Sequence, residues 1–490
     1  ERLEQSTSAN PFDEEQLVLC PPEFAASALA QNLILDASWD LVVVDEAHRI
    51  APGSDEFSFL ERLAAHAPSL LLLTATPEQV GQEAHFARLA LLDPERFHDF
   101  ASYQDEEQTY RRWSDMLEDL DRGELPEDLP ADVRTLDTAA ERVTALLDRY
   151  GTGRVLFRNT RAAVGGFPIR RLHFEALEAP DNVAYLELYP DRKLPAETWL
   201  ADDPRVRWLI TRLRELRPQK VLVICATAET ALALEEFLQL RSGIRSAAFH
   251  EYLTIVERDR AAAYFAEREQ GAQVLICSEI GGEGRNFQFA QHLVLFDLPE
   301  HPDQLEQRIG RLDRIGQRDE IFIHVPYIQG GAQHTLMRWY HEGMDLFARS
   351  CSAGDTILEK FGARLAKELQ RITPDLDELI DETAEFTEAT RAALSLGRDR
   401  LLERSSCNVE VGEQLVTGIA ALEDPEQAYS YLEELCAVAG VHHEEHSEYT
   451  AVIRRGEEEV LTVFSDLPEE GATVPLDRSR ALQRDDREDR

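Results

Sequence analysis

The sequence lacks the features of disulfide-rich, cysteine-ligated or membrane-spanning proteins. Its six cysteines are scattered over 490 residues without a C-x-x-C pair, which argues against a disulfide framework or a cysteine zinc site. No run of 18 apolar residues is present, so no membrane span is predicted, and no signal-peptide pattern is visible. The scattered cysteines fit a reducing cytoplasm.

Positive charge is also scarce. Lys and Arg together number 51 against 93 Asp and Glu, which gives a formal net charge of −42. Such a balance argues against a protein that coats nucleic acid non-specifically, although it leaves room for a locally basic groove. Hydrophobic residues make up 43% of the chain, enough for a substantial core, and the length suits about three or four domains.

One short stretch near the start combines a strand pattern with ionisable side chains. Leu41–Val44 is apolar and rich in β-branched residues, which is typical of a strand buried on both faces. It runs directly into Asp45, Glu46 and His48. Because ligands of open α/β sheets bind at the carboxyl ends of strands, one carboxylate there can hold Mg2+ while the other polarises a water. From these residues alone, an acidic turn remains the alternative.

The alternation of strand and helix patterns divides the chain into five regions. These are part of an α/β domain over 1–100, a helical insertion and bridge over 101–200, a second doubly wound α/β domain over 201–350, long helices over 351–405 and an α+β region over 406–490. The predicted strands are 16–20, 41–44, 70–73, 155–158, 221–225, 246–249, 274–277, 293–296, 321–325, 451–453 and 460–464. The predicted helices are 23–35, 57–66, 205–216, 227–240, 255–267, 304–308, 333–349, much of 355–404, and 423–438. The histidine-rich stretch 442–446 is expected to be a polar loop.

Two stretches of the second α/β domain contain groups suited to phosphate. Gln307–Gln317 places three arginines, Arg308, Arg311 and Arg314, at three-residue spacing on one side of a helical turn. The planar, permanently charged guanidinium suits a phosphate that gains charge in a transition state. Ser278–Phe287 follows a predicted strand and contains three glycines, which let the backbone approach an anion. The alternatives are a solvated basic helix face and a simple tight turn.

Four stretches of the chain resemble, in order and spacing, motifs II, III, V and VI of the superfamily 2 nucleic-acid motors. They are Asp45-Glu46-Ala47-His48, Thr74-Ala75-Thr76, the Ser278–Phe287 loop and Gln307–Gln317. The ending Asp313–Gln317 is similar to the Swi/Snf branch rather than to the DEAD-box branch. Further stretches resemble a bacterial group of RNA polymerase-associated ATPases within that branch: residues 249–251, 255–263, 285–290 and 338–343.

The resemblance implies a fold, a reaction and partners. The fold would be α/β, with two RecA-like doubly wound parallel-sheet lobes, the first incomplete, plus helical insertions and a C-terminal α+β region. The cofactors would be ATP and Mg2+, and the partners RNA polymerase core with double-stranded DNA or an RNA–DNA hybrid. No membrane is expected, and the location would be the bacterial cytoplasm near the nucleoid.

The resemblance also implies a role for each matched residue. Asp45 would hold Mg2+ and contact the nucleotide with His48, and Glu46 would activate the attacking water. Arg311 and Arg314 would be arginine fingers. The remaining residues are grouped by role: nucleotide binding for Gly282, Gly284, Gln307 and Arg308; coupling between the lobes for Thr74 and Thr76 together with His48; nucleic-acid contact for Ser278, Arg285 and Asn286.

One expected motif is missing. The family cradles phosphates with G-x-x-x-x-G-K-[ST], but none of the four lysines (Lys193, Lys220, Lys360, Lys367) follows a glycine. Because the chain also starts with Glu1, we expect a fragment whose phosphate loop lies before residue 1 and which also lacks the family's extreme C-terminal domain. Alone it should hydrolyse no ATP. The alternatives are a strand-separating helicase of the same superfamily or, if no such lysine exists upstream, a non-catalytic polymerase-binding scaffold.

Overall fold

The structure is a computed structural model of the 490-residue chain. It describes residues 10–478 with internal gaps. The residues outside the description are 1–9, 15, 75–81, 116–128, 150–154, 158–160, 162–165, 193, 268–269, 280–286, 288, 318–319, 352, 372–373, 398–408, 448, 457–466, 468–470 and 479–490. In the part that is described, no helix is both long and apolar enough to cross a membrane.

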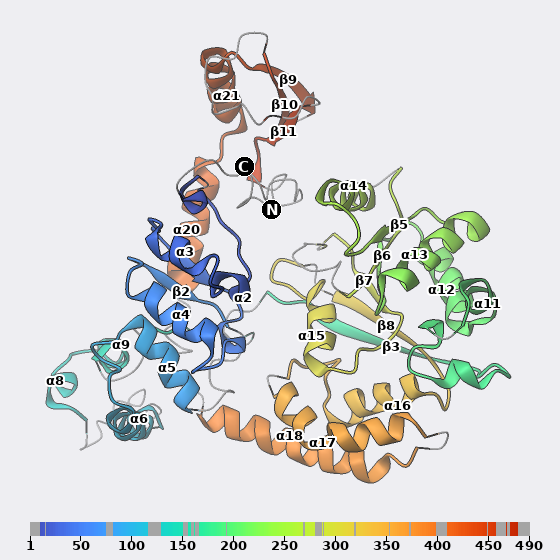
Figure 1. Ribbon diagram of the computed structural model, residues 1–490, viewed down its shortest axis with the longest axis horizontal. Coiled ribbons are helices and arrows are strands. Elements are labelled where there is room, and N and C mark those ends of the chain that lie inside the picture. Colours follow the sequence, from blue (N-terminus) through green and yellow to red (C-terminus); the bar gives the residue numbers. More distant parts are fainter. Residues whose placement is uncertain are drawn as a thin grey trace. The chain divides into compact units, whose positions relative to one another are not determined.

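The chain divides into two compact units. Unit 1 consists of residues 1–163 and 394–407, and unit 2 of residues 164–393 and 408–490. In Figure 1, unit 1 appears mostly in blue to cyan and the central sheet of unit 2 in green to yellow. Each unit is described by itself below. The five regions drawn from the sequence remain predictions.

Unit 1 contains a two-stranded parallel sheet, in which Val42 pairs with Leu70 and Val44 with Leu72. Its elements are the 3-10 turn Pro11–Asp13, α2 Pro22–Ala25, α3 Gln31–Asp36, β1 Val42–Val44, the 3-10 turn Ala47–Arg49, α4 Asp55–Ala64, β2 Leu70–Leu72, α5 Gln82–Leu92, α6 Phe100–Asp115, α8 Ala131–Arg134 and α9 Ala139–Arg149. The two strands and α4 lie close to their predicted positions. Ser54 caps α4, since its hydroxyl accepts a hydrogen bond from the Phe57 N–H.

Two expectations for the start of unit 1 are wrong. Residues 16–20 form no strand, and Leu19 is almost fully exposed. The predicted helix 23–35 is broken between α2 and α3, where the chain turns at Ser27–Ala30. Ala30, in the turn, and Ile34, in α3, pack in one apolar cluster with Phe59 and Leu63 of α4.

β1 is also not buried on both faces as its sequence predicts. Val43 is 49% exposed and its register partner Leu71 is 45% exposed, whereas Val42, on the opposite face, packs against the cluster of α3 and α4. The reason is that only two strands are present in the described part of unit 1, and nothing in it covers the second face. Parallel sheets normally have both faces covered.

The core of unit 2 is a six-stranded, entirely parallel sheet with the order β3-β8-β7-β4-β6-β5. Its strands are β3 Ile169–Leu177, β4 Val221–Ile224, β5 Ser246–Phe249, β6 Val274–Cys277, β7 His292–Leu295 and β8 Glu320–Ile328. The helical segments between them are the 3-10 turns Val183–Leu186 and Pro190–Arg192, α11 Ala196–Asp202, α12 Pro204–Glu215, α13 Ala228–Phe237 with the π turn Leu238–Ser242, α14 Ile255–Ala266 and α15 Pro302–Gly310. Strands that alternate with helices confirm the predicted α/β class.

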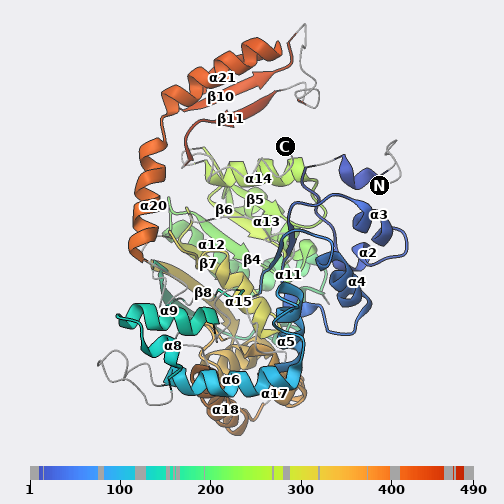
Figure 2. The same ribbon diagram turned by 90° about the vertical axis from the view of Figure 1, so that its left-hand side faces the viewer.

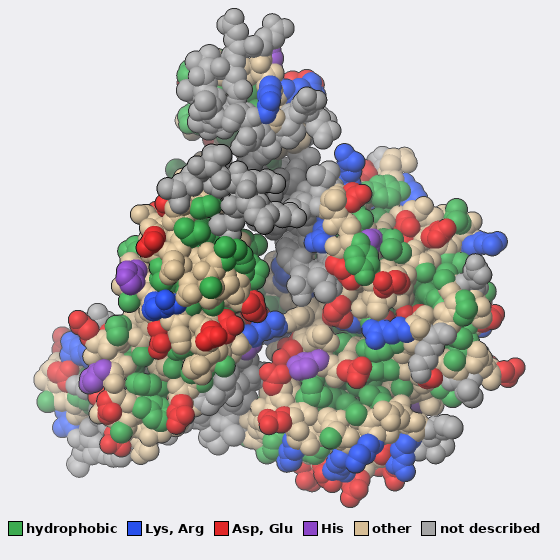
Figure 3. Space-filling model, viewed as in Figure 1, with side chains coloured by type: hydrophobic (Ala, Val, Ile, Leu, Met, Phe, Trp, Pro, Cys, Tyr) green, Lys and Arg blue, Asp and Glu red, His purple; other side chains and the backbone are tan. Residues whose placement is uncertain are grey.

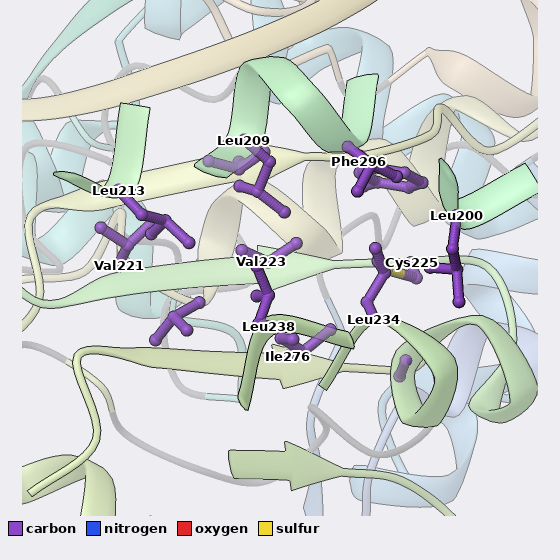
Figure 4. Packing of buried hydrophobic residues seen from close by; sticks show 14 of the residues in the cluster. Leu200, Leu209, Leu213, Val221, Val223, Cys225, Leu234, Leu238, Ile276 and Phe296 are labelled. Atoms are coloured by element: carbon purple, nitrogen blue, oxygen red, sulfur yellow. The ribbon is translucent and has the colours of Figure 1, made fainter. Parts of the chain in front are cut away.

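The continuous apolar runs explain why the central strands were predictable. Every residue of β4, β6 and β7 is buried, as expected for strands covered on both faces. Figure 4 shows Leu209 and Leu213 of α12 packing over Val221 and Val223 of β4, with Leu234 on the other side of the strand. This single cluster joins α11, α12 and α13 to the sheet.

β3 was missed, and the strand predicted at 155–158 is absent over its described residues, 155–157. β3 is interrupted by Arg170, Arg171, His173 and Glu175 rather than being a continuous apolar run. It pairs in register with β8 over nine residues, from Ile169 with Glu320 to Leu177 with Ile328. It lies at the edge of the sheet, where alternate side chains reach solvent.

Helices follow the sheet. They are α16 Ala332–Arg338 with the π turn Trp339–Gly343, α17 Gly354–Leu369 and α18 Asp377–Gly397. The predicted helix 333–349 ends early, and Asp345 adopts a left-handed conformation with φ 53°. Figure 3 shows basic and acidic side chains gathered at the lower edge, where Figure 1 draws α17 and α18; among them are the ion pairs of Arg364 with Glu382 and Arg371 with Glu368.

The C-terminal residues form a small α+β layer. Its elements are α20 Val409–Leu422, α21 Pro425–Ala439, β9 His442–Ser447, β10 Thr450–Arg454 and β11 Ala472–Pro475, with the antiparallel order β11-β10-β9. Figure 2 shows α21 alongside β10 and β11. The predicted polar loop at 442–446 is wrong, because these residues pair with β10 as a strand. The predicted strand 460–464 lies outside the described residues.

Candidate functional site

The carboxyl end of β1 brings four of the predicted site residues together in unit 1. The parallel ladder continues past the strand, since the Leu73 N–H donates to the Val44 carbonyl (2.8 Å) and the Ala47 N–H to the Leu73 carbonyl (2.9 Å). This register places the side chains of His48 and Thr74 next to each other: the Nδ1 atom of His48 lies 3.1 Å from the Thr74 hydroxyl. The same Nδ1 atom lies 3.2 Å from a carboxylate oxygen of Glu46.

Glu46 adopts a backbone conformation that is rare for its residue type. Its φ of 49° and ψ of 42° are left-handed, a region that non-glycine residues occupy at an energetic cost and that recurs at functional sites. The Glu46 N–H donates to the Asp45 carboxylate (2.9 Å). The Glu46 side chain remains 42% exposed, so its carboxylate can reach a water.

Arg88, which was not predicted as a site residue, holds this turn in place. Arg88 lies on α5 and is buried, and its guanidinium donates to the carbonyl oxygens of Ala47 (3.0 Å), His48 (3.0 Å), Ile50 (3.1 Å) and Ala84 (2.8 Å). Burial lowers the pKa of this guanidinium below its ordinary value. A cation amid carbonyl oxygens satisfies buried acceptors that would otherwise be costly.

In unit 2, Ser278 stands at the carboxyl end of β6. Its N–H donates to the Phe249 carbonyl (3.1 Å), and its hydroxyl donates to the carboxylate of Glu251 (2.5 Å). Ser278 is buried, so in this structure its hydroxyl faces Glu251 rather than the surface where nucleic acid would lie.

Arg308, on α15, faces the protein interior. Its Nη1 donates to the backbone carbonyl (2.7 Å) and the carboxylate (3.0 Å) of Asp297, and its Nε and Nη2 donate to both carboxylate oxygens of Glu279. Burial would lower its pKa, but the two carboxylates raise the pKa of Arg308 above its ordinary value. These donors are therefore directed at protein carboxylates, whereas the sequence placed Arg308 in the nucleotide site.

Arg311 and Arg314 follow at the end of α15, and both are half-buried. Asp313, between them, is buried and forms an ion pair with Arg170 of β3 (2.5 Å). The Nε of Arg314 donates to the Gly310 carbonyl (3.0 Å), which orients its side chain along the helix end. Arg311 and Arg314, to which the family resemblance assigns the role of arginine fingers, are thus partly exposed. Asp313, between them, links this segment to β3.

The remaining predicted site residues are Gln307 and five residues that lie outside the described part of the chain. Gln307 is half-buried on α15. Five residues lie outside the described part of the chain: Thr76, Gly282, Gly284, Arg285 and Asn286. The structure therefore groups the motif II and III residues in unit 1 and the motif V and VI residues in unit 2.

The donor set of unit 1 suits a hard cation. Asp45 and Glu46 offer adjacent carboxylate oxygens at the end of a parallel strand, the ligand type and position in which Mg2+ is commonly held beside phosphates. Half-buried arginines in unit 2 suit phosphate oxygens. The sequence contributes no G-x-x-x-x-G-K-[ST] loop to either unit, so these residues fit a nucleotide only in part.

Two family models match parts of the chain. Residues 205–316, which include the sheet from β4 to β7, match the family model described as "Helicase conserved C-terminal domain". Residues 320–488 match the one described as "RNA polymerase recycling family C-terminal".

Individual relatives match almost the whole chain. The chain is 47% identical over 526 residues to the RNA polymerase-associated protein RapA of Pseudomonas fluorescens strain Pf0-1, an alignment that covers 99% of the chain and 55% of that protein. It is 46% identical to RapA of Pseudomonas putida strain GB-1 and of Pseudomonas aeruginosa strain LESB58, again over 99% of the chain and 55% of each. The chain is thus a homologue of the RapA proteins, and it spans about half of their length.

Solved structures show a weaker likeness. The Sulfolobus solfataricus SWI2/SNF2 ATPase core in complex with dsDNA is 16% identical with a TM-score of 0.31, covering 69% of this chain and 75% of that chain. The SWI2/SNF2 ATPase core domain from the same organism is also 16% identical, with a TM-score of 0.33, covering 69% of this chain and 74% of that chain.

Proposed function

We propose that the chain forms the greater part of an ATP-dependent nucleic-acid translocase of the Swi/Snf type. In this proposal Asp45 holds Mg2+, Glu46 accepts a proton from the attacking water, and Arg311 and Arg314 stabilise the charge that develops on the transferred phosphate. General-base catalysis contributes about 10²–10⁴ in rate, and an arginine finger about 10³–10⁵.

The observation that supports this proposal most directly is the turn after β1. Glu46 is held in a left-handed conformation with its carboxylate exposed, and His48 lies within 3.2 Å of both Glu46 and Thr74. Because His48 contacts both residues, a shift of the Glu46 side chain would move the imidazole of His48, and that movement would displace the segment of Thr74 and Thr76. A merely acidic turn needs neither a strained residue such as Glu46 nor a buried arginine bound to the carbonyls of the residues that follow it.

In this proposal the phosphate-binding lysine comes from outside the 490 residues, and further strands come from residues outside the described part of unit 1. The exposed apolar side chains of Leu41, Val43, Leu71 and Leu73 lie on one face of the β1–β2 pair. Two parallel strands with an uncovered apolar face are unstable by themselves. Further strands at the edges of this sheet, with helices packed on that face, would bury it and complete a first RecA-like lobe, with Mg2+ and ATP at its carboxyl edge.

The partners follow from the relatives. RNA polymerase core is the proposed protein partner, because the RapA relatives are named as polymerase-associated and residues 320–488 match a polymerase-recycling family. The proposed track is double-stranded DNA or an RNA–DNA hybrid, and the activity would promote polymerase recycling during transcription. The proposed location is the bacterial cytoplasm, in association with the nucleoid.

The test compares residues 1–490 with the protein in its natural full length. We expect no measurable ATP hydrolysis by residues 1–490, and hydrolysis by the full-length protein that Glu46→Gln abolishes. Displacement of a triplex strand without separation of the duplex supports a translocase, whereas efficient duplex unwinding favours a strand-separating helicase. Hydrolysis by residues 1–490 that Glu46→Gln abolishes would contradict the expected need for the phosphate loop.

One other function, that of a non-catalytic polymerase-binding scaffold, is favoured if no glycine–lysine phosphate loop exists upstream of residue 1, because the 490 residues contain none. Binding of RNA polymerase core by a full-length protein that hydrolyses no ATP would support it.

A further inference from the structure

Four cations gather at the amino-terminal edge of the unit 2 sheet, although the formal net charge of the chain is −42. Strands β5, β6 and β4 are parallel neighbours, so their first residues meet at one edge. Arg245 directly precedes β5, and Lys220 directly precedes β4. Arg217 lies three residues before Lys220, and Arg214 stands one turn earlier, in the last turn of α12. These four residues are called the basic edge below.

Hydrogen bonds connect the basic edge around Gln273, the residue before β6. The Nε of Arg217 donates to the side-chain oxygen of Gln273 (3.2 Å), and the Gln273 N–H donates to the Arg245 carbonyl (2.8 Å). The Lys220 ammonium donates to the Glu267 carbonyl. Burial, followed by the charge of Arg245, lowers the pKa of Lys220, and the charge of Glu267 offsets this only in part. Lys220 and Arg245 therefore lie close enough to repel each other.

The arginines of the basic edge are exposed and carry little compensating charge. Arg214, Arg217 and Arg245 are all exposed. Over the described residues, no ion pair joins Arg214 or Arg217 to a carboxylate. Exposed arginines elsewhere in unit 2 do pair with carboxylates, as Arg171 does with Glu320 (2.5 Å). The basic edge is thus a local excess of positive charge on an acidic protein.

A structural role accounts for one of the four cations. Arg214 lies at the carboxyl end of α12, where a positive charge complements the helix dipole. Lys220 and Arg245 precede strands instead, and a sheet has only a small net dipole. The cations before the strands therefore need another explanation.

We propose that the basic edge binds the phosphodiester backbone of a nucleic acid. The inference rests on the proposed function only in taking a nucleic acid as the polyanion. The contact would be separate from the one that the family resemblance assigns to Ser278, because Ser278 follows the carboxyl end of β6, at the opposite edge of the sheet.

The chemistry of the basic edge favours a nucleic acid over a protein partner. Protein interfaces have an apolar core, whereas this cluster presents guanidinium and ammonium groups, which suit phosphate oxygens. Three neighbouring strands span about 10 Å. Because phosphates follow one another at about 3.4 Å along the axis for each strand of a duplex, the basic edge is long enough to contact more than one of them.

The test measures how binding of nucleic acid by the natural full-length protein depends on salt, without ATP. The probes are duplex DNA and single-stranded RNA of equal length, and the variant is Arg214→Gln/Arg217→Gln/Arg245→Gln. Each lost phosphate contact makes the slope of log K against log salt shallower by about 0.9 on a duplex and about 0.7 on a single strand. We expect a change of about 2.7 on DNA or about 2.1 on RNA for three lost contacts.

Two further variants accompany the assay, with thermal melts of all proteins. Arg214→Lys/Arg217→Lys/Arg245→Lys keeps the charges and should keep the slope of the wild type. Arg349→Gln/Arg371→Gln/Arg454→Gln is the matched control, because it removes the same charge from exposed, ion-paired positions elsewhere in unit 2. Its slope should also equal that of the wild type.

Because binding is measured without hydrolysis, the inference and the proposed function can fail separately. A shallower slope on either probe supports the inference and identifies the bound nucleic acid. An unchanged slope on both probes overturns it, also where the glutamine variant binds RNA polymerase core less tightly, since the basic edge would then contact an acidic protein surface.

An equal change in the control overturns the inference too, because the slope would then report net charge alone. So does a change that comes with a lowered melting temperature and that the lysine variant shares. A full-length protein that binds nucleic acid through the basic edge but hydrolyses no ATP would overturn the proposed function alone.

Discussion

Three stacked histidines in the sheet of unit 2 make its stability depend on pH. His173, His292 and His324 come from β3, β7 and β8; His324 stacks on His173 at 5.0 Å and on His292 at 5.4 Å between ring centroids. The Nδ1 of His292 lies 3.1 Å from the Nε2 of His324. The Nε2 of His292 and the Nδ1 of His324 are buried and have no hydrogen-bond partner, so neither ring can be protonated without a buried, unpaired charge.

Burial is the main cause that lowers the pKa of His292 to about 4 and that of His324 to about 3, and the neighbouring rings and Arg212 lower both further. The unfolded chain, with histidine pKa values of about 6.5, binds more protons than the folded protein from about pH 6.5 down to these values. Folding stability therefore falls as pH falls through this window. From pH 7.5 to 5.5 each histidine costs about 1.4 kcal/mol, and the two together about 2.7 kcal/mol.

The assay follows urea unfolding of unit 2 by hydrogen exchange in peptides that contain β7 and β8, at pH 7.5 and 5.5. The double variant His292→Gln/His324→Gln removes both imidazoles, and its loss of stability between the two pH values should be smaller than that of the wild type by about 2.7 kcal/mol. His98→Gln, which removes an exposed imidazole of unit 1, is the control and should match the wild type. Equal pH dependence in the wild type and the double variant would refute the reasoning.

Two further substitutions test buried arginines. Arg88→Met removes the guanidinium that donates to four buried or partly buried carbonyl oxygens and should destabilise unit 1 by about 3 kcal/mol in urea unfolding. Arg49→Met, at an exposed position, should change it by less than about 0.5 kcal/mol, and equal effects would contradict a clamping role for Arg88. Asp203→Asn removes the partner of Arg205, which is fully enclosed and paired at 2.7 Å, and should lower the unfolding free energy of unit 2 by about 3–5 kcal/mol, whereas a loss below 1 kcal/mol would indicate that solvent reaches the pair.

The strands that could be predicted from the sequence are those buried on both faces of the sheet. β4 and β6 are continuous apolar runs because both faces are covered, so their residues alone identify them. β3 was not predicted because it is an edge strand whose arginines pair with distant residues, as Arg170 does with Asp313. The strand expected at 16–20 failed for a related reason: a local β pattern cannot supply the neighbouring strand with which it must pair.

The candidate site likewise contains residues that could be predicted from the sequence and residues that could not. The Asp45–His48 turn and the arginines at 308, 311 and 314 follow from residue type and spacing. The difference among those arginines does not, because it depends on Glu279 and Asp297, which only the fold brings to Arg308. Arg88 was invisible for the same reason: its carbonyl partners are mostly about 40 residues away, and any residue type supplies a carbonyl.

Under the proposed function, ATP hydrolysis requires both Glu46 and Arg314. The most direct test of this requirement is the steady-state ATPase rate of the natural full-length protein with duplex DNA, for the wild type, Glu46→Gln, Arg314→Lys and the exposed control Arg349→Lys. We expect kcat to fall at least about 100-fold in each of the first two variants and to remain unchanged in the control. A kcat within about twofold of the wild type for either Glu46→Gln or Arg314→Lys would contradict the account, since both roles are worth far more than that.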